Sequence, residues 1–463
     1  MESQRKFFES GRTRDARFRR DSLARLEKAI TGAENGILEA LKSDLGKPAF
    51  EAWGSEIGPV LGELRFARRK MAGWMKQRRV STPLLSFPGR SYIRPEPFGC
   101  VLIMAPWNYP FHLTLMPLVS AIAAGNCAVL KPSEFAPATA RLMSEIVEKT
   151  FDPGQVTVVE GDAGTAEALL REKWDYILFS GSTAVGRKVM EAAAKNLTPL
   201  TLELGGKCPA IIAADADIAV SARRIAWGKF YNAGQTCVAP DYALVAESVR
   251  EEFIAGLRKS ITEFFGKNPA ESPDYARIVN SRHFARLSGL MGGGRVRLAH
   301  GGRDLAPSGR VLCGGEMDRE RLYIAPTVIG DVPAGGELMR DEIFGPLLPV
   351  LSFRDMEEAV RVVKSLPPPL SIYCFTRNPA TMEGILGAVP SGGAIMNDTL
   401  VQMANPRLPF GGTGASGFGR YHGRAGFDAF SQKRGVLRRP FWPDFRFRYP
   451  PYKLPLGWLK KLF

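Results

Sequence analysis

The chain has 463 residues, which is too long for one compact core and predicts two or three domains. Its composition, 45% hydrophobic and 24% charged, is that of a globular protein and argues against disorder. The net charge is +15, but the basic residues are dispersed and no nucleic-acid-binding motif accompanies them, so we expect no specific nucleic-acid partner.

The cysteines and the chain ends indicate the compartment. No two of the six cysteines have CxxC spacing, so we expect neither a bound metal nor a redox pair. The first residues are polar, and no apolar run is long enough to span a bilayer. These features predict a cytoplasmic protein without a transmembrane anchor, and they leave open a weak contact of the basic C-terminal tail with membrane surfaces.

The chain opens with helices and then becomes extended. Apolar residues at helical spacing run from residue 21 to residue 76, with a break at Gly46-Lys47-Pro48. Residues 81–99 are rich in proline and glycine and look extended around residues 91–94, which is typical of a hairpin or a crossing segment.

From residue 100 onward, short apolar runs alternate with helical patterns. The expected strands are 100–104, 128–130, 156–159 and 176–179, and the expected helices are 113–124, 136–150, 163–171 and 183–195. This alternation predicts a parallel sheet covered on both faces, with ligands bound beyond the carboxyl ends of its strands. A second α/β unit follows to about residue 397, with strands at 210–212 and 242–245 around a helix at 218–231.

Three residues are candidates for catalysis. Cys237, in Gly234-Gln235-Thr236-Cys237, would attack as a thiolate; the alternative is a buried structural cysteine. Glu203 lies between leucines, and partial desolvation would raise its pKa towards that of a general base; the alternative is a salt-bridged glutamate. Asn108 follows the first strand in a stiff loop and would donate to an oxyanion, or else close its own turn.

Other segments suggest a dinucleotide site. Lys131 and Glu134 follow the second strand and would hydrogen-bond ribose hydroxyls. The turn 181–186 opens a helix, where backbone N–H groups would meet a pyrophosphate; the alternative is an ordinary tight turn, since the spacing is not GxGxxG. Glu342 and Phe344 precede a Gly-Pro turn and would bind a ribose and pack on a nicotinamide ring, or form a polar turn beside a core phenylalanine.

Taken together, these segments resemble the aldehyde dehydrogenase superfamily over nearly the whole chain. The matching segments, all in the order of the family, are Pro106-Trp107-Asn108, Lys131-Pro132-Ser133-Glu134, Phe179-Ser180-Gly181-Ser182-Thr183, Leu202-Glu203-Leu204-Gly205-Gly206-Lys207, Gly234-Gln235-Thr236-Cys237 and Glu342-Ile343-Phe344-Gly345-Pro346. The class 3 branch of fatty and aromatic aldehyde dehydrogenases is the closest in resemblance, through Leu408-Pro409-Phe410-Gly411-Gly412 and Gly419-Arg420-Tyr421-His422-Gly423.

The resemblance implies an oxidoreductase that converts aldehydes to carboxylic acids with NAD or NADP. Cys237 would form a thiohemiacetal and then a thioester, Asn108 would stabilise the oxyanion, and Glu203 would activate the hydrolytic water. The implied cofactor contacts are Lys131, Glu134, Gly181, Ser182, Thr183, Ala184, Val185, Gly186, Glu342, Phe344 and Trp107. Glu134 disfavours a 2′-phosphate, but the class 3 branch often accepts both cofactors.

The implied fold is α/β and aldehyde dehydrogenase-like, with three parts. They are a Rossmann-like NAD(P)-binding domain (1–84 and 100–209), an α/β catalytic domain (210–410) and a small bridging β element (85–99 and 411–440), followed by a tail (441–463). In the family the bridging element joins subunits, so we expect a homodimer. The alternative functions are cysteine-dependent acyl transfer or ester hydrolysis on the same scaffold, a structural protein, and a basic nucleic-acid or membrane binder.

Overall fold

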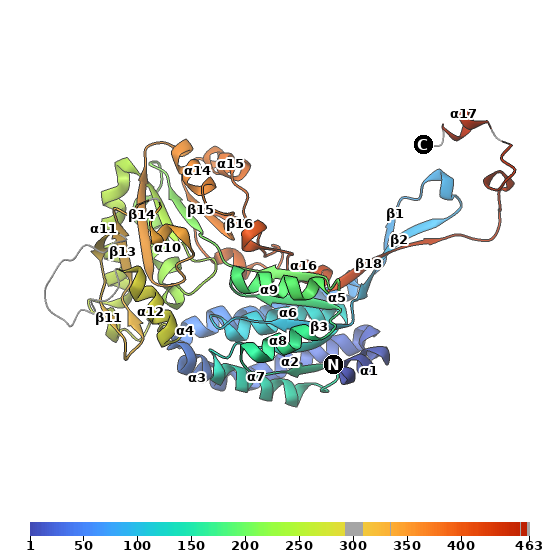
Figure 1. Cartoon of the computed structure of the whole chain (residues 1–463), viewed down its shortest axis with the longest axis horizontal. Helices are drawn as coiled ribbons and strands as arrows, with labels where there is room; N and C mark the ends of the chain where they lie inside the picture. Colours follow the sequence, from blue (N-terminus) through green and yellow to red (C-terminus); the bar gives the residue numbers. More distant parts are fainter. Residues whose placement is uncertain (292–308, 334, 454, 461–463) are drawn as a thin grey trace.

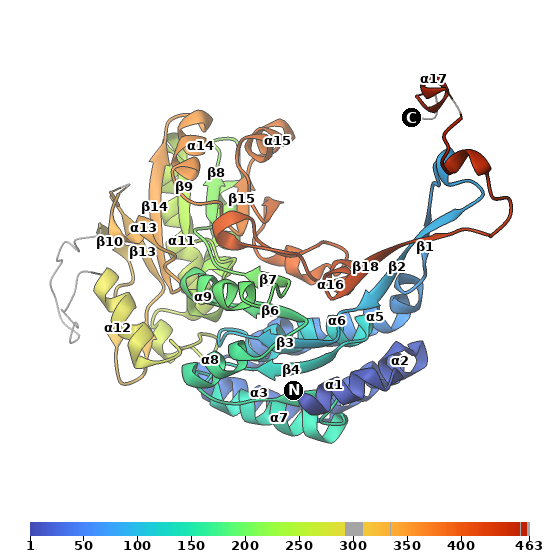
Figure 2. The same ribbon diagram turned by 45° about the vertical axis from the view of Figure 1, so that its right-hand side comes forward.

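The computed structural model describes residues 1–291, 309–333, 335–453 and 455–460. Two open sheets with their helices form the body, and a third, narrow sheet projects from it together with the C-terminal segment (Figure 1). Figure 2 shows the same projection from another side, with β18 leading out of the body beside β2.

The N-terminal region is helical, as predicted, but the helices begin before residue 21. They are α1 (Glu2–Glu9), α2 (Ala16–Gly32), α3 (Glu34–Leu45), α4 (Ala49–Ala52), the π-helical turn η2 (Trp53–Ile57) and α5 (Gly58–Trp74). The side chain of Asp15 accepts hydrogen bonds from the N–H groups of Arg17 and Phe18, which caps α2. The expected break at Gly46 is present, where a positive φ of 60° ends α3.

The first sheet has six strands in the order β17-β7-β6-β3-β4-β5. Its strands are β3 (Cys100–Met104), β4 (Cys127–Lys131), β5 (Val156–Val158), β6 (Tyr176–Ser180), β7 (Leu200–Glu203) and β17 (Gly417–Phe418). All are parallel except β17, which pairs antiparallel with β7. The helices between them are α6 (Pro110–Ala124), α7 (Pro137–Thr150), α8 (Ala163–Arg171) and α9 (Thr183–Ala194).

Side chains of this sheet alternate between two apolar cores, as the period of a strand requires. Val101 and Ile103 pack with α2, α5 and α6, whereas Leu102 and Met104 pack on the opposite face with α9. All the residues of α6 are buried, which fits a helix that is apolar on every side. The prediction of a parallel sheet covered on both faces is confirmed.

The second sheet has seven strands in the order β10-β13-β14-β9-β8-β15-β16. They are β8 (Pro209–Ile212), β9 (Tyr242–Ala246), β10 (Arg310–Cys313), β13 (Thr327–Gly330), β14 (Leu347–Phe353), β15 (Ser371–Phe375) and β16 (Gly393–Met396). Its helices are α10 (Ile218–Phe230), α11 (Arg250–Phe265), α12 (Ser281–Leu290), α13 (Glu337–Arg340), α14 (Met356–Lys364) and α15 (Pro379–Ala388). A two-stranded pair, β11 (Met317–Asp318) and β12 (Tyr323–Ile324), lies beside them.

The third sheet is formed by segments far apart in the sequence. Its strands are β1 (Arg78–Val80), β2 (Arg90–Pro97) and β18 (Ser431–Arg438), paired antiparallel with β2 in the middle. The expected ranges for the bridging element were 85–99 and 411–440. Strand β1 belongs to this sheet but lies outside those ranges. Strand β17 lies inside them but pairs with the first sheet. Helix α16 (Gly423–Ala429) precedes β18, and α17 (Leu456–Leu459) lies further along, in the C-terminal segment. Residues 454 and 461–463 of the expected tail lie outside the described residues.

Short 3-10 turns join several of these elements. They are η1 (Arg12–Arg14), η3 (Leu84–Ser86), η4 (Tyr231–Gly234), η5 (Glu247–Val249), η6 (Pro269–Glu271), η7 (Val401–Ala404), η8 (Gly414–Ser416) and η9 (Arg446–Arg448). Among the helices of the described ranges, none combines the length and the apolar character that crossing a membrane requires.

Candidate active site

The carboxyl edge of the first sheet gathers predicted residues from four strands. Met104 pairs with Lys131 and with Phe179, and Ser180 pairs with Glu203, so these parallel strands end level with one another. The loop with Asn108 follows β3 and the turn 181–186 follows β6, which places both at this edge. The chain reverses its strand order between β3 and β6, the place where open α/β sheets bind ligands.

The second sheet contributes through its amino edge. Strands β8, β9 and β14 are parallel neighbours, so the loops that precede them meet at one edge. The loop before β9 carries Cys237, and the loop before β14 carries Glu342 and Phe344. The two edges touch: Asn108 Nδ2 donates to the Gln235 carbonyl oxygen at 3.0 Å, and the hydroxyls of Tyr109 and Thr236 lie 2.7 Å apart in a hydrogen bond.

An unusual backbone turn presents Cys237. Asn232, Ala233 and Gly234 have positive φ values of 52°, 51° and 74°, a conformation that non-glycine residues rarely adopt. A Cβ on Gly234 would lie 2.2 Å from the Gly345 carbonyl oxygen, so only glycine fits there. The turn leaves Cys237 partly exposed at the site rather than sealed in the core.

Glu203 is a carboxyl without a hydrogen-bond partner. Its side chain is 4% exposed at the end of β7, and both of its oxygens are unpartnered among the described residues. Burial raises its pKa well above the ordinary value, and the charge of Arg420 offsets this only in part. A desolvated carboxyl of this kind binds a proton strongly, as a general base must.

Cys237 lies within the electrostatic reach of two carboxyls. Burial raises the pKa of its thiol, and negative charge on Glu342 and on Glu203 raises it further. The thiol therefore needs a base or a bound positive charge to ionise. The structure brings the sulfur, the Glu203 carboxyl and, through the Gln235 contact, the Asn108 amide into one region, although the three are far apart in the sequence.

Asn108 has spare hydrogen-bonding capacity. One of its two amide hydrogens serves the bond to Gln235, and its Oδ1 has no partner among the described residues. Its side chain is held in a buried polar contact and keeps a donor for an oxygen in the site.

Lys131 and Glu134 pair with each other. Lys131 Nζ lies 3.1 Å from Glu134 Oε2 and also donates to the Pro132 carbonyl oxygen at 3.1 Å. Lys131 ends β4, three strand positions from Glu203 on β7, or roughly 14 Å at the usual strand spacing. A dinucleotide laid along the edge would span that separation, and the Glu134 side chain, 35% exposed, remains accessible to it.

The turn 181–186 fits a pyrophosphate. Ser182 caps α9 by accepting from the Val185 N–H at 3.4 Å, and Ser182, Ala184 and Val185 are exposed. A Cβ on Gly186 would lie 2.6 Å from a methyl group of Leu204, so glycine lets α9 pack close to the end of β7. The accessible N-terminus of a twelve-residue helix favours an anion.

Trp107 lies in the loop after β3, and Glu342 and Phe344 lie in the loop before β14. The rings of Trp107 and Phe344 pack edge to face with centroids 5.3 Å apart. A Cβ on Gly205 would lie 1.8 Å from Glu342 Oε2, so this glycine admits the carboxyl to the edge of the first sheet. Burial raises the pKa of Glu342 to about 8, with a further contribution from the charge of Asp241.

Two buried ion pairs at the site escaped the sequence analysis. Lys207 pairs with Asp241 and donates to the carbonyl oxygens of Leu338 and Asp341, at 2.7 and 3.0 Å, next to the loop with Glu342. Lys47 pairs with Glu56 beneath Asn108. Lys207 ends the family-like segment Leu202-Glu203-Leu204-Gly205-Gly206-Lys207, and Lys47 lies in the predicted helix break. Nothing in the sequence pattern indicated that Asp241 and Glu56 are their ion-pair partners.

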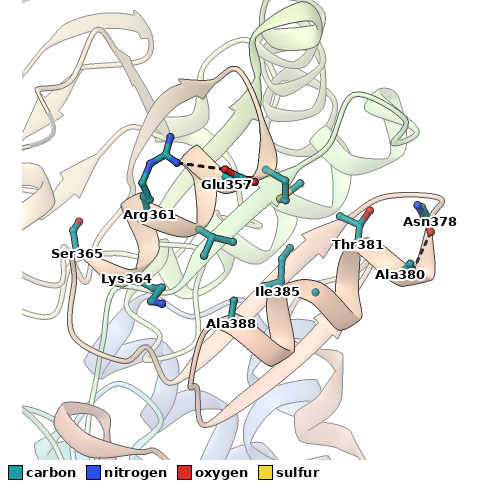
Figure 3. A pocket seen from close by; sticks show the side chains of 12 residues that line it. Glu357, Arg361, Lys364, Ser365, Asn378, Ala380, Thr381, Ile385 and Ala388 are labelled. Carbon is teal, nitrogen blue, oxygen red and sulfur yellow. Dashed lines mark hydrogen bonds and ion pairs between the residues drawn. The ribbon is translucent and has the colours of Figure 1, made fainter.

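A groove elsewhere on the surface is not part of this site. It has a volume of about 840 Å³ and lies between α14 and α15, where Glu357, Arg361 and Thr381 line it (Figure 3). None of the predicted site residues lines it. Within the described ranges, no group of His, Cys, Asp or Glu side chains is arranged to hold a metal ion.

Comparison with known proteins shows which family the chain belongs to. The profile of the aldehyde dehydrogenase family matches residues 1–436. The chain is 43% identical to the 4,4′-diaponeurosporen-aldehyde dehydrogenase of Staphylococcus aureus, over 99% of this chain and 97% of that protein. It is 44% identical to the aldehyde dehydrogenase family 3 member B1 of Mus musculus, over 98% and 94%. A solved structure of the substrate-bound state of Staphylococcus aureus AldH superposes with a TM-score of 0.94 at 42% identity, covering 100% of this chain and 98% of that one.

Proposed function

Because this chain belongs to the aldehyde dehydrogenase family and oxidises aldehydes to carboxylic acids with NAD or NADP, we propose that Cys237, Asn108 and Glu203 are its catalytic residues. The observation that carries the assignment is the meeting of the Cys237 loop with the Asn108 loop, through Asn108 Nδ2 and the Gln235 carbonyl oxygen. The family match does not favour the alternative of acyl transfer or ester hydrolysis.

In this proposal Cys237 attacks the aldehyde carbon. The positive charge of a bound nicotinamide would favour loss of the thiol proton to solvent. The thiolate then forms a C–S bond, and the carbonyl π electrons move to the oxygen. Asn108 Nδ2 and the Cys237 backbone N–H donate to that oxyanion, which is the largest stabilising effect in reactions of this type. A nicotinamide cofactor, when bound, would supply the hydride acceptor, and loss of the hydride from the carbon would leave a thioester on Cys237.

Glu203 then acts as the general base. Its carboxylate takes a proton from water, the hydroxide oxygen attacks the thioester carbon, and the C–S bond breaks to return the Cys237 thiolate and release the acid. Two observations support this role: the side chain lies buried at the end of β7, and its carboxyl oxygens are free of partners among the described residues.

We propose that the cofactor lies along the carboxyl edge of the first sheet. Lys131 and Glu134 would hold the adenine-side ribose, the turn 181–186 the pyrophosphate, and Glu342 the nicotinamide-side ribose. Phe344 and Trp107 would pack beside the nicotinamide. The accessible α9 N-terminus and the glycine that admits Glu342 support this placement. On this basis residues 1–84 and 100–209 form the cofactor domain, and residues 210–410 the catalytic domain.

We also propose a cytoplasmic homodimer. The sheet of β1, β2 and β18 stands away from the body, and exposed apolar residues such as Leu437 and Phe441 lie on or beside it. A projecting sheet with unpaired edges is stabilised when a second copy covers it. Sedimentation of the full chain tests this assembly, and a single monomeric species at micromolar concentration would exclude it.

The basic tail after residue 441 would add at most weak binding to anionic vesicles, which co-sedimentation with such vesicles would reveal.

The catalytic assignment is tested by stopped-flow absorbance of reduced nicotinamide across a panel of aldehydes. For Cys237→Ala we expect no burst and no turnover, because no thioester can form. For Glu203→Gln we expect the burst to remain and steady turnover to fall by about 100-fold, because the loss of a general base slows only hydrolysis. Turnover by the cysteine variant, or loss of the burst in the glutamine variant, would contradict the corresponding role.

A further inference from the structure

A fully buried ion pair lies behind the loop that carries Asn108. The side chains of Lys47 and Glu56 have no exposed surface, and Lys47 Nζ lies 2.5 Å from Glu56 Oε1. Removing two charges from water is costly, and such a pair adds little net stability compared with apolar residues of the same size. What the pair contacts therefore matters more than the strength of the pair itself.

Lys47 holds the peptide group of Asn108. Its Nζ donates to the Asn108 carbonyl oxygen at 3.2 Å, and the same oxygen accepts from Asn232 Nδ2 at 2.9 Å. The ammonium group also lies 4.2 Å from the centre of the Tyr109 ring. Two donors on one carbonyl fix the plane of the peptide after Asn108, and with it the direction in which the Asn108 side chain leaves the backbone.

Glu56 holds the segment that follows. Its Oε2 accepts from the N–H groups of Phe111 and His112, at 3.1 and 3.0 Å, in the first turn of α6. These N–H groups have no partner within the helix, and a carboxylate is favoured there by the helix dipole. The two members of the pair thus grip the chain at Asn108 and three residues further on.

We propose that Lys47 and Glu56 are positioning residues that aim the Asn108 amide at the developing oxyanion. The inference rests on the proposed function, in which Asn108 Nδ2 is an oxyanion donor. Removal of one oxyanion donor typically lowers kcat by about 100- to 1000-fold. Because a donor that is present but badly aimed loses part of that effect, we expect removal of the pair to lower the rate by about 10- to 100-fold.

The test is a double-mutant cycle with Asn108. The variant Lys47→Met/Glu56→Gln removes both charges of the pair together. No single charge is therefore left buried without its partner. The burst rate, kcat and the KM for aldehyde are measured for this change in the native protein and again with Asn108→Ala. We expect a loss of about 10- to 100-fold in the native protein and of less than about 3-fold with Asn108→Ala, where no amide is left to be aimed.

The outcomes separate three cases. An equal loss in the two backgrounds, or no loss in either, overturns the inference. If Asn108→Ala alone leaves the burst unchanged, the role of Asn108 in the proposed function is what fails. A double variant that does not fold is replaced by Lys47→Met alone in the same cycle, because the Glu56 carboxyl left behind can become neutral by binding a proton. Arg223→Met, which breaks the exposed pair between Arg223 and Glu263, serves as the matched control and should leave the burst unchanged.

Discussion

Glu51 is a buried carboxyl whose titration couples stability to pH. Its side chain is 7% exposed, and its Oε1 accepts from the Asn232 N–H at 2.8 Å, inside the turn that presents Cys237. Burial raises its pKa from 4.5 to about 7, while the nearby charge of Lys47 opposes the shift. The folded protein therefore holds this proton more tightly than the unfolded chain does.

The sign and the size of the effect follow from that difference. The stabilisation is complete below pH 4.5, the unfolded value, and is lost as the pH rises through about 7. A pKa difference of about 2.5 between the two states corresponds to roughly 3.4 kcal/mol in total. About 2 kcal/mol of it should be lost between about pH 5.5 and pH 8.5.

The assay is urea unfolding at these two pH values for the native protein and for Glu51→Gln. The glutamine oxygen still accepts from Asn232, so the change removes the titration and keeps the hydrogen bond. We expect the free energy of unfolding of the variant to change with pH by about 2 kcal/mol less than that of the native protein. Glu39→Gln, at an exposed position on α3, is the control. The same pH dependence in the native protein and in Glu51→Gln would refute the reasoning.

Two further predictions concern the loops of the second sheet. For Asp241→Asn we expect a loss of about 3–5 kcal/mol in the free energy of unfolding, because Lys207 and Lys229 stay buried without a counter-charge. An unchanged urea midpoint would contradict this loss of stability. The KM for the cofactor should also rise, since Asp241 Oδ1 accepts from the Ile343 N–H at 3.0 Å beside Glu342. For Gly234→Ala we expect kcat to fall by at least about 10-fold, because the added Cβ displaces the turn before Cys237. An unaltered kcat would show that catalysis does not depend on the exact position of this turn.

The strands of the first sheet could be predicted closely because local signals mark them. The expected strand 100–104 is β3, and 128–130 lies inside β4, since short apolar runs there are bounded by loops. The helix expected at 113–124 ends where predicted, at Gly125 with a φ of 95°, but begins at Pro110. Proline is favoured in the first turn of a helix, a signal that the apolar spacing alone did not use.

Helix α1 was not predicted, and the reason is different. In α1 only Gln4 and Phe7 are buried, so most of its residues are polar and carry no apolar stripe. It is held by tertiary contacts instead, such as the packing of Phe7 against the first sheet. Most helical stability in proteins comes from such packing, which the sequence of the helix does not display.

The sequence predicts which residues belong to the candidate site, but not how these residues are arranged in space. Lys131 and Glu203 end strands of one parallel sheet and Asn108 lies in the loop after a third, and the rule that such ends share an edge places them together. Cys237 and Glu342 instead precede strands of the second sheet, and no local pattern tells which edge of one sheet faces the other. The family resemblance predicted that Cys237 and Glu342 lie near the residues of the first sheet. The hydrogen bond between Asn108 and Gln235 shows how the loop of Cys237 meets that sheet.

The proposed catalytic centre is divided between two sheets and needs a rigid joint, to which Gln235 and Asn232 contribute. Gln235 Nε2 donates to the Asn232 and Arg277 carbonyl oxygens, at 3.0 and 2.9 Å, and its Oε1 accepts from the Val279 N–H at 3.0 Å. Its own carbonyl oxygen accepts from both Asn108 and Asn232. The hydrogen bonds that join the loops of the two sheets run from Asn108 Nδ2 to the Gln235 carbonyl oxygen, from Asn232 Nδ2 to the Asn108 carbonyl oxygen, and between the hydroxyls of Tyr109 and Thr236. A relative shift of the sheets would break these bonds in a medium of low dielectric constant. Directional polar contacts therefore suit this joint better than apolar packing, which permits sliding.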